Sequence, residues 1–280
     1  MTLRSGRVLD FSGSALVMAI VNCNQDSFYA PSRALKEKAV EKALTAAEDG
    51  AAIIDFGAES TRPGSSYISC EEEIGRLIPV ISAFRKKSFI PVSVDTRKAI
   101  VARAALDSGA DIINDISGLA DDPEMAAVCA EKGAAIVLVH KKGIPLTMQA
   151  EPHYDDLLAE LGSFFKDAVN KALYAGINAG KIIVDPGFGF CKSLKDNLTI
   201  LRSLMRLAEI CGKDYPVMVG LSRKNFIGEI TGCRDAMDRL PGTLAANGAA
   251  IMAGADIIRV HDVKEHIDMA KVLFAVRQEQ

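Results

Sequence analysis

Ile182-Ile-Val-Asp185-Pro-Gly187 is a short apolar run that ends in a carboxylate and a turn, and it sets the pattern for the whole chain. Seven other runs share its form, being short, rich in Val and Ile, and closed by polar residues. They cover residues 15–22, 52–57, 91–96, 111–116, 135–140, 216–222 and 257–262. Continuous apolar runs of this length are typical of parallel strands covered on both faces.

Amphipathic helices fit between these runs. Val40, Ala43, Leu44 and Ala47 recur at helical spacing, and Gly50 can end that helix in the left-handed conformation. Strands that alternate with helices predict an α/β fold with a parallel sheet. Eight such units with no spare segment predict closure into one (β/α)8 TIM barrel, and the alternative is an open doubly wound sheet.

The length of the chain fits that barrel. The 280 residues predict a single domain over 1–280, because one barrel needs about 250 residues. In such barrels the active site lies at the C-terminal ends of the strands. We therefore expect the chemistry of this chain at the polar residues that close the eight runs.

Composition narrows the partners and the compartment. A net charge of −3 argues against nucleic acid and anionic membrane as main partners. The apolar run at 15–21 is too short to span a bilayer, which needs about 20 residues. The 6 cysteines form no C-x-x-C pair, so we expect reduced thiols and a cytoplasmic protein.

Four basic side chains near the strand ends suit an anion such as phosphate or pyrophosphate. They are Arg62, Lys224, Arg259 and His261. The alternative is that these charged residues pair with carboxylates of the same rim.

Three acceptor or amide side chains close neighbouring runs: Asp95, Asn114 and Asp185. Carboxylates at that depth are costly unless donors match them. A flat heterocycle with an amino-pyrimidinone edge offers such donors in a row. The rim therefore predicts a hydrogen-bonding slot beside an anion pocket.

Seven short motifs in this order resemble the dihydropteroate synthases. They are Asn22 with Asp26-Ser-Phe28, Glu59-Ser-Thr-Arg-Pro-Gly64, Ser93-Val-Asp-Thr96, Ile113-Asn-Asp-Ile116, Asp185-Pro-Gly-Phe-Gly-Phe190, Ser222-Arg-Lys224 and Arg259-Val-His-Asp-Val263. They extend over most of the chain. The resemblance implies a barrel enzyme, usually a homodimer, that joins 6-hydroxymethyl-7,8-dihydropterin pyrophosphate to para-aminobenzoate with Mg²⁺.

The resemblance also implies a role for each matching residue. Asp95, Asn114, Asp185 and Lys224 would bind the pterin, and Asp95, Asp185 and Lys224 would be catalytic. Asn22, Arg62, Arg259 and His261 would bind the pyrophosphate, with Asn22 also a ligand of Mg²⁺. Phe28, Thr61, Pro63, Phe190, Ser222 and Asn225 would bind the aminobenzoate. The chain departs from the family at Asn24-Gln25, where Thr-Pro is usual.

The implied reaction is a dissociative displacement of pyrophosphate, in which Asp95 and Asp185 stabilise the developing pterin cation. Two other enzyme classes remain as alternatives: a barrel lyase with Lys224 as Schiff base, and a folate-dependent methyltransferase that passes methyl to a corrinoid. A third alternative is a pterin-binding paralogue without catalysis. His153 and His266 are predicted to lie on the surface.

Overall fold

The computed structural model describes residues 1–23, 32–60, 67–143, 152–211 and 215–278. Eight parallel strands form its sheet: β1 (Leu16–Asn22), β2 (Ile53–Gly57), β3 (Val92–Asp95), β4 (Ile112–Asp115), β5 (Ala135–Val139), β6 (Ile182–Asp185), β7 (Met218–Val219) and β8 (Ile257–Val260). Each lies within one of the predicted runs. β7 is the shortest of them, with 2 residues.

The sheet closes on itself. Its strand order is β6-β5-β4-β3-β2-β1-β8-β7, and a parallel bridge between Val184 and Val217 joins the two ends. The backbone N–H of Val184 donates to the carbonyl of Pro216 at 3.0 Å across the same seam. The barrel prediction is therefore confirmed, and the open doubly wound sheet is excluded.

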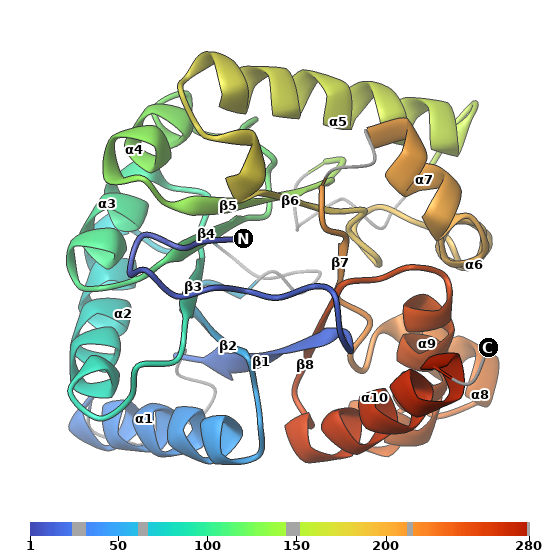
Figure 1. The fold of residues 1–280 in the computed structure, drawn as a ribbon, viewed down its shortest axis with the longest axis horizontal. Helices are drawn as coiled ribbons and strands as arrows, with labels where there is room; N and C mark the ends of the chain where they lie inside the picture. Colours follow the sequence, from blue (N-terminus) through green and yellow to red (C-terminus); the bar gives the residue numbers. More distant parts are fainter. Residues whose placement is uncertain (24–31, 61–66, 144–151, 212–214, 279–280) are drawn as a thin grey trace.

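Helices surround the strands (Figure 1). They are α1 (Ser32–Glu48), α2 (Cys70–Arg85), α3 (Ala99–Asp107), α4 (Met125–Lys132), α5 (Leu157–Tyr174), α6 (Leu194–Arg202), α7 (Leu204–Cys211), α8 (Asn225–Thr231), α9 (Leu240–Met252) and α10 (Val263–Gln278). Two short 3₁₀ helices cover Ala179–Lys181 and Ala236–Arg239. The described residues thus contain two α-helices more than predicted, because two connections, β6 to β7 and β7 to β8, each hold a pair.

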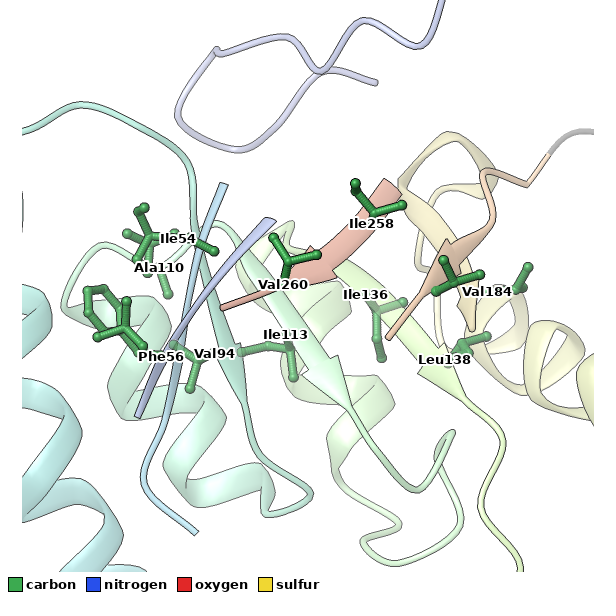
Figure 2. Packing of buried hydrophobic residues seen from close by; sticks show 14 of the residues in the cluster. Ile54, Phe56, Val94, Ala110, Ile113, Ile136, Leu138, Val184, Ile258 and Val260 are labelled. Carbon is green, nitrogen blue, oxygen red and sulfur yellow. The ribbon is translucent and has the colours of Figure 1, made fainter. Parts of the chain in front are cut away.

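Side chains alternate along each strand between two apolar layers. The outer layer lies between strands and helices, and Figure 2 shows part of it, including Phe56, Val94 and Ile113. The inner layer fills the barrel and includes Ile53 and Ile112 near the amino ends of their strands. Strands covered on both faces are apolar at nearly every position, as the sequence predicted.

The amino end of the barrel is closed by the first residues of the chain. Thr2 and Val8 form an antiparallel bridge, and the segment crosses the barrel in Figure 1. Leu3 and Leu9 are buried in the inner layer with Met18. The interior of the barrel is therefore apolar at this end, and the polar inward-facing side chains lie at the other.

A buried ion pair joins α2 to the start of β4. Arg85 donates to the carbonyl of Gly109 at 2.8 Å and to the carboxylate of Asp111, which is 1% exposed. Asp111 also accepts the backbone N–H of Val92 at 3.1 Å. A buried carboxylate whose cation is removed is strongly destabilising.

Arg85→Met should therefore lower the free energy of unfolding by about 3 kcal/mol, measured by urea denaturation. The matched control is Arg103→Met, which breaks an exposed pair with Glu131 and should change stability little. Equal losses in the two variants would show that the Asp111 pair contributes no more than a surface pair.

Candidate functional site

Polar side chains occupy the inward positions at the carboxyl ends of the strands. Asp55 follows Ile53 on β2 by two residues, Asn114 follows Ile112 on β4, and Asp185 follows Ile183 on β6. Two-residue alternation sends both members of each pair into the barrel. A polar layer therefore lies directly above the apolar inner layer, which explains why buried strands end in carboxylates and amides.

Arg259 on β8 is held by two of these carboxylates. Its Nε lies 2.7 Å from Asp55 Oδ2, and its Nη2 lies 2.8 Å from Asp95 Oδ2. Burial raises the pKa of Asp95 above its usual range, and Arg259 opposes that rise. The pairing alternative is thus confirmed for Arg259, whose role toward pyrophosphate stays a prediction.

A pocket opens above this ion pair and brings together all four predicted pterin residues. It is lined by Asp95, Asn114, Ile116, Val139, Asp185, Gly187, Phe188, Phe190, Met218, Gly220, Lys224 and Arg259. Lys224 caps the N-terminus of α8, and its Nζ lies 4.6 Å from the centre of the Phe190 ring. Residues from six strands and the loops that follow them therefore form one site.

Burial sets the protonation of this pocket. It raises the pKa of Asp185 to about 6, against the opposing effects of the Gly187 N–H, Lys224, Arg259 and Lys192. It lowers the pKa of Lys224 to about 8. Groups whose pKa values move toward neutrality in a pocket are typical of functional sites.

Several acceptors in and under this pocket have no hydrogen-bond partner within the described part of the chain. They are Asp55 Oδ1, Ser93 Oγ and Asn114 Oδ1, all buried. The amide nitrogen of Asn114 lies 3.4 Å from Asp55 Oδ2, so its oxygen is left to face other groups. Buried polar atoms are nearly always hydrogen-bonded, so this arrangement fits a ligand or water that supplies donors.

Gly187 allows the loop after β6 to turn beside β5. Its φ is +67°, and a Cβ at this position would lie 2.0 Å from the carbonyl oxygen of His140. Its N–H donates to Asp185 Oδ1 at 2.7 Å. A side chain here would displace the loop that orients the Asp185 carboxylate.

His261 lies beside the pocket and contacts Ser222. Its backbone N–H donates to Ser222 Oγ at 3.3 Å, and its Nδ1 lies 2.9 Å from the same oxygen. The Nε2 nitrogen has no contact with Ser222. Burial, with Lys42 as the second cause, lowers the pKa of His261 to about 3.

A second cavity of about 380 Å³ lies between α1 and the β8–α10 junction. His261 lines it together with Lys38 and Lys42 of α1. Arg223, which has a left-handed backbone with φ of 57°, is paired to the Asp262 carboxylate. Glu41 and Asp49 line the same cavity, so of its two lysines only Lys42 acts on His261, and the sequence alone did not indicate it.

The remaining predicted residues are more dispersed. Asn22 ends β1 and is exposed, and Asn225 Oδ1 accepts a hydrogen bond from Arg239 Nη1 at 2.9 Å. The predictions for Phe28, Thr61, Arg62, Pro63 and the Asn24-Gln25 departure lie outside the described residues. No cluster of three His, Cys, Asp or Glu side chains suited to a metal occurs in the described ranges, so Asn22 as a metal ligand stays a prediction.

Buried charges also fix the loop that follows β2. Lys98 Nζ donates to Glu59 and, at 2.6 Å, to Glu73, and Arg97 Nη2 lies 3.3 Å from Glu59. Lys98 is 9% exposed, and Glu73 is 1% exposed. Glu59 begins one of the sequence motifs, so this cluster anchors the start of that segment to α2 and α3.

The surface prediction for His266 is wrong. His266 is 0% exposed, its Nε2 lies 3.0 Å from Asn247 Nδ2, and its Nδ1 faces the carbonyl of Asp262. Val263, His266 and Ala270 lie on the buried face of α10, a helical spacing that could have revealed it. His153, by contrast, has an 82% exposed side chain, as predicted.

Comparison with known proteins agrees with this geometry. The family described as pterin binding enzyme matches residues 18–261. A dihydropteroate synthase of Synechocystis sp. is 43% identical over 270 residues, which is 96% of this chain and 92% of that protein. Across the described residues, no helix is long and apolar enough to cross a membrane.

Two solved structures are similar along their whole length. One is the Yersinia pestis dihydropteroate synthase in a sulfonamide drug complex, with a TM-score of 0.92, 37% identity and coverage of 99% of both chains. The other is the Xanthomonas albilineans dihydropteroate synthase in complex with 7,8-dihydropteroate, with a TM-score of 0.87 and 39% identity, covering 98% of this chain and 97% of that one.

Arg259→Met should destabilise the fold in a pH-dependent way. Losing Arg259 raises the pKa of Asp95 further, and a carboxyl with a raised folded-state pKa stabilises the fold below its unfolded pKa and loses that contribution as pH rises. Urea denaturation should therefore show that the free energy of unfolding of the variant falls further below that of the parent protein at about pH 8 than at about pH 5. A deficit independent of pH would mean that Arg259 acts through packing alone.

Proposed function

The chain belongs to the dihydropteroate synthase family of pterin binding enzymes, and we propose that its described pocket performs the reaction of that family on 6-hydroxymethyl-7,8-dihydropterin pyrophosphate and para-aminobenzoate. The products are 7,8-dihydropteroate and pyrophosphate. The observation that supports this assignment is the buried pocket in which Asn114, Asp185 and Lys224 face one another with acceptors left unpaired.

The pterin edge supplies the donors that this pocket lacks. Its ring N–H and amino groups match the Asp185 carboxylate and the free oxygen of Asn114. A hydrogen bond to a charged group contributes about 1.5–3 kcal/mol, which is enough to select the pyrimidinone edge over a ring without those donors. Lys224 donates to a ring acceptor from the opposite wall, and Phe190 covers the ring.

The pyrophosphate lies toward β8 and α1 in this proposal. His261 offers a ring nitrogen as donor, and Lys42 adds charge from the cavity beside it. Arg62 and Arg259 complete the anion site, Arg259 with the edge that its carboxylates leave open. This arrangement places the leaving group outside the polar layer and the ring inside it.

Mg²⁺ fits the exposed end of β1. Asn22 offers a single amide oxygen there, and Mg²⁺ takes oxygen ligands, keeps several waters and relies on substrate phosphates. When bound, it would neutralise the charge on pyrophosphate and improve it as a leaving group. No other described side chain is assigned to the metal.

The reaction breaks the bond between the pterin methylene carbon and pyrophosphate oxygen, which leaves with both electrons. The carboxylates of Asp95 and Asp185 then stabilise the positive charge spread over the pterin. The amine of para-aminobenzoate forms the new C–N bond and loses one proton to water. Phe190, Ser222 and Asn225, with Phe28, Thr61 and Pro63, would hold the aminobenzoate.

The alternative chemistries lack this support. A Schiff-base lyase would use Lys224, whose pKa is lowered to about 8, but Lys224 caps α8 and follows the end of β7 rather than lying on a strand. A methyltransferase that uses a corrinoid would have no use for the His261 side of the site. A pterin-binding paralogue without catalysis would have the same pocket, so only a measurement of turnover distinguishes it from the proposed enzyme.

We also propose a homodimer in the cytoplasm. Large apolar side chains are exposed on α8–α10 and the short helix between α8 and α9, and such surfaces are typical of subunit interfaces. They are Ile230, Met237, Met252, Val272 and Val276.

The proposal of a cytoplasmic protein agrees with the state of Cys23. Burial raises the pKa of the Cys23 thiol to about 12, so this cysteine is unreactive and needs no oxidising compartment.

The decisive assay is pyrophosphate release from the pterin pyrophosphate with and without para-aminobenzoate. Release that depends on the amine, with dihydropteroate formed in equal amount, supports the assignment. Pterin binding without such release would indicate the paralogue without catalysis. Reduction by borohydride with a carbonyl substrate would trap Lys224 only in the lyase.

His261→Ala should narrow the affinity gap between the pterin pyrophosphate and the same pterin without pyrophosphate, measured by calorimetry in Mg²⁺. The loss of one hydrogen bond to a charged group corresponds to about 1.5–3 kcal/mol, all of it on the pyrophosphate ligand. His153→Ala, at an exposed position, is the matched control and should leave the gap unchanged. Equal weakening of both ligands by His261→Ala would make this residue structural.

A further inference from the structure

A buried lysine lies behind the pterin pocket. Lys192 is 3% exposed, and its Nζ lies 2.9 Å from His140 Nδ1 and 3.1 Å from the carbonyl oxygen of Phe190. Among the described residues it forms no ion pair with a carboxylate. A buried ammonium without a paired anion is costly, so the position has a reason other than stability.

The loop that carries Lys192 is fixed by hydrogen bonds. Asn197 accepts the N–H of Gly189 at 2.9 Å and donates to the carbonyls of Lys192 at 3.2 Å and Ser193 at 2.7 Å. Cys191 has a left-handed backbone with φ of 49°, and Lys192, which follows it, is buried. The hydrogen bonds of Asn197 hold the backbone on both sides of this turn.

His140 holds the other side of the ammonium. Its ring stands edge-on to Phe164 with centroids 4.8 Å apart, and its backbone N–H donates to the carbonyl of Asp185 at 2.9 Å. Burial lowers the pKa of His140 to about 3, so its Nδ1 is available as an acceptor. The ammonium thus ties the end of β5 to the loop that follows β6.

Charged groups from several elements face this lysine. Burial lowers the pKa of Lys192 to about 7, while Asp185, Cys191 and Asp196 oppose that change and Lys224 adds to it. In return, Lys192 is one of the cations that lower the pKa of Asp185, with Lys224 and Arg259. Lys192 and Asp185 are therefore coupled although no hydrogen bond joins them.

We propose that Lys192 is a positioning residue of the pterin pocket: its ammonium fixes the carbonyl of Phe190 through a hydrogen bond and places a positive charge behind the carboxylate of Asp185. The lysine touches no reacting atom. This inference rests on the proposed function of the pocket and names a residue that acts through Asp185 and Phe190. It predicts that pterin affinity follows the charge of Lys192.

The test compares Lys192→Met and Lys192→Arg with the parent protein. Binding of 6-hydroxymethylpterin is measured by calorimetry from about pH 5 to about pH 9. In the parent protein, affinity should fall as pH drops through about 6, because Asp185 is protonated, and also as pH rises through about 7, because Lys192 loses its proton.

Lys192→Met should move the acid limb, which is the fall in pterin affinity at low pH, to higher pH, because Asp185 loses a neighbouring cation. At a pH below the pKa of Asp185, each unit by which that pKa rises weakens pterin binding about tenfold. Lys192→Arg keeps the charge, so its acid limb should stay, and its alkaline limb should move up to about 8, where Lys224 titrates. Lys195→Met, which removes an exposed lysine of α6, is the matched control and should leave both limbs unchanged.

Equal weakening by the Met and Arg variants at every pH, or no effect of either, would overturn the proposal. If Lys192→Met does not fold, Lys192→Arg alone tests the proposal. A fall in pterin affinity at the same alkaline pH in Lys192→Arg as in the parent protein would then overturn the proposal. Pterin binding with these limbs but no pyrophosphate release from the parent protein would contradict the proposed function and leave this inference standing.

Discussion

One buried cation shared by two carboxylates organises the mouth of the barrel. Asp55 is fully buried, and Arg259 lies 2.7 Å from it and 2.8 Å from Asp95. Burying two carboxylates at that depth is costly, and the shared guanidinium offsets part of that cost. Because Asp55, Asp95 and Arg259 come from β2, β3 and β8, their two ion pairs also hold these strands together. The polar layer is therefore part of the fold before any ligand binds.

Much of this arrangement could be predicted from the alternation of side-chain direction along the strands. A strand of four or five residues has two inward positions. When the first of these is apolar and the second polar, the first belongs to the core and the second to the site. Asn114 and Asp185 follow this rule on β4 and β6, and the predicted runs match the strands. Spacing therefore predicted the strands and the polar residues that close them, with the open sheet left as an alternative, and the resemblance to the dihydropteroate synthases added the barrel enzyme and the roles of these residues.

Side-chain contacts that depend on strand register or on the direction of a loop residue could not be predicted from spacing. The pairing of Arg259 with Asp55 depends on the register of β8 against β1 and β2, which spacing does not give. Lys192 follows a left-handed residue and is buried, and nothing in its local sequence marks that turn. Lys42 belongs to a helix and meets His261 only through the closure of the barrel. The helical spacing of Val263, His266 and Ala270 does indicate a buried position for His266, so this error was avoidable.

The distribution of charge around the pocket fits a reaction that forms a cation. Two carboxylates, Asp95 and Asp185, line the pocket together with the cations Arg259 and Lys224, and Asp55 lies beneath as a partner of Arg259. Lys192 adds a cationic group behind the wall. Burial raises the pKa of Asp185, so this carboxylate gains when positive charge develops on the ring beside it.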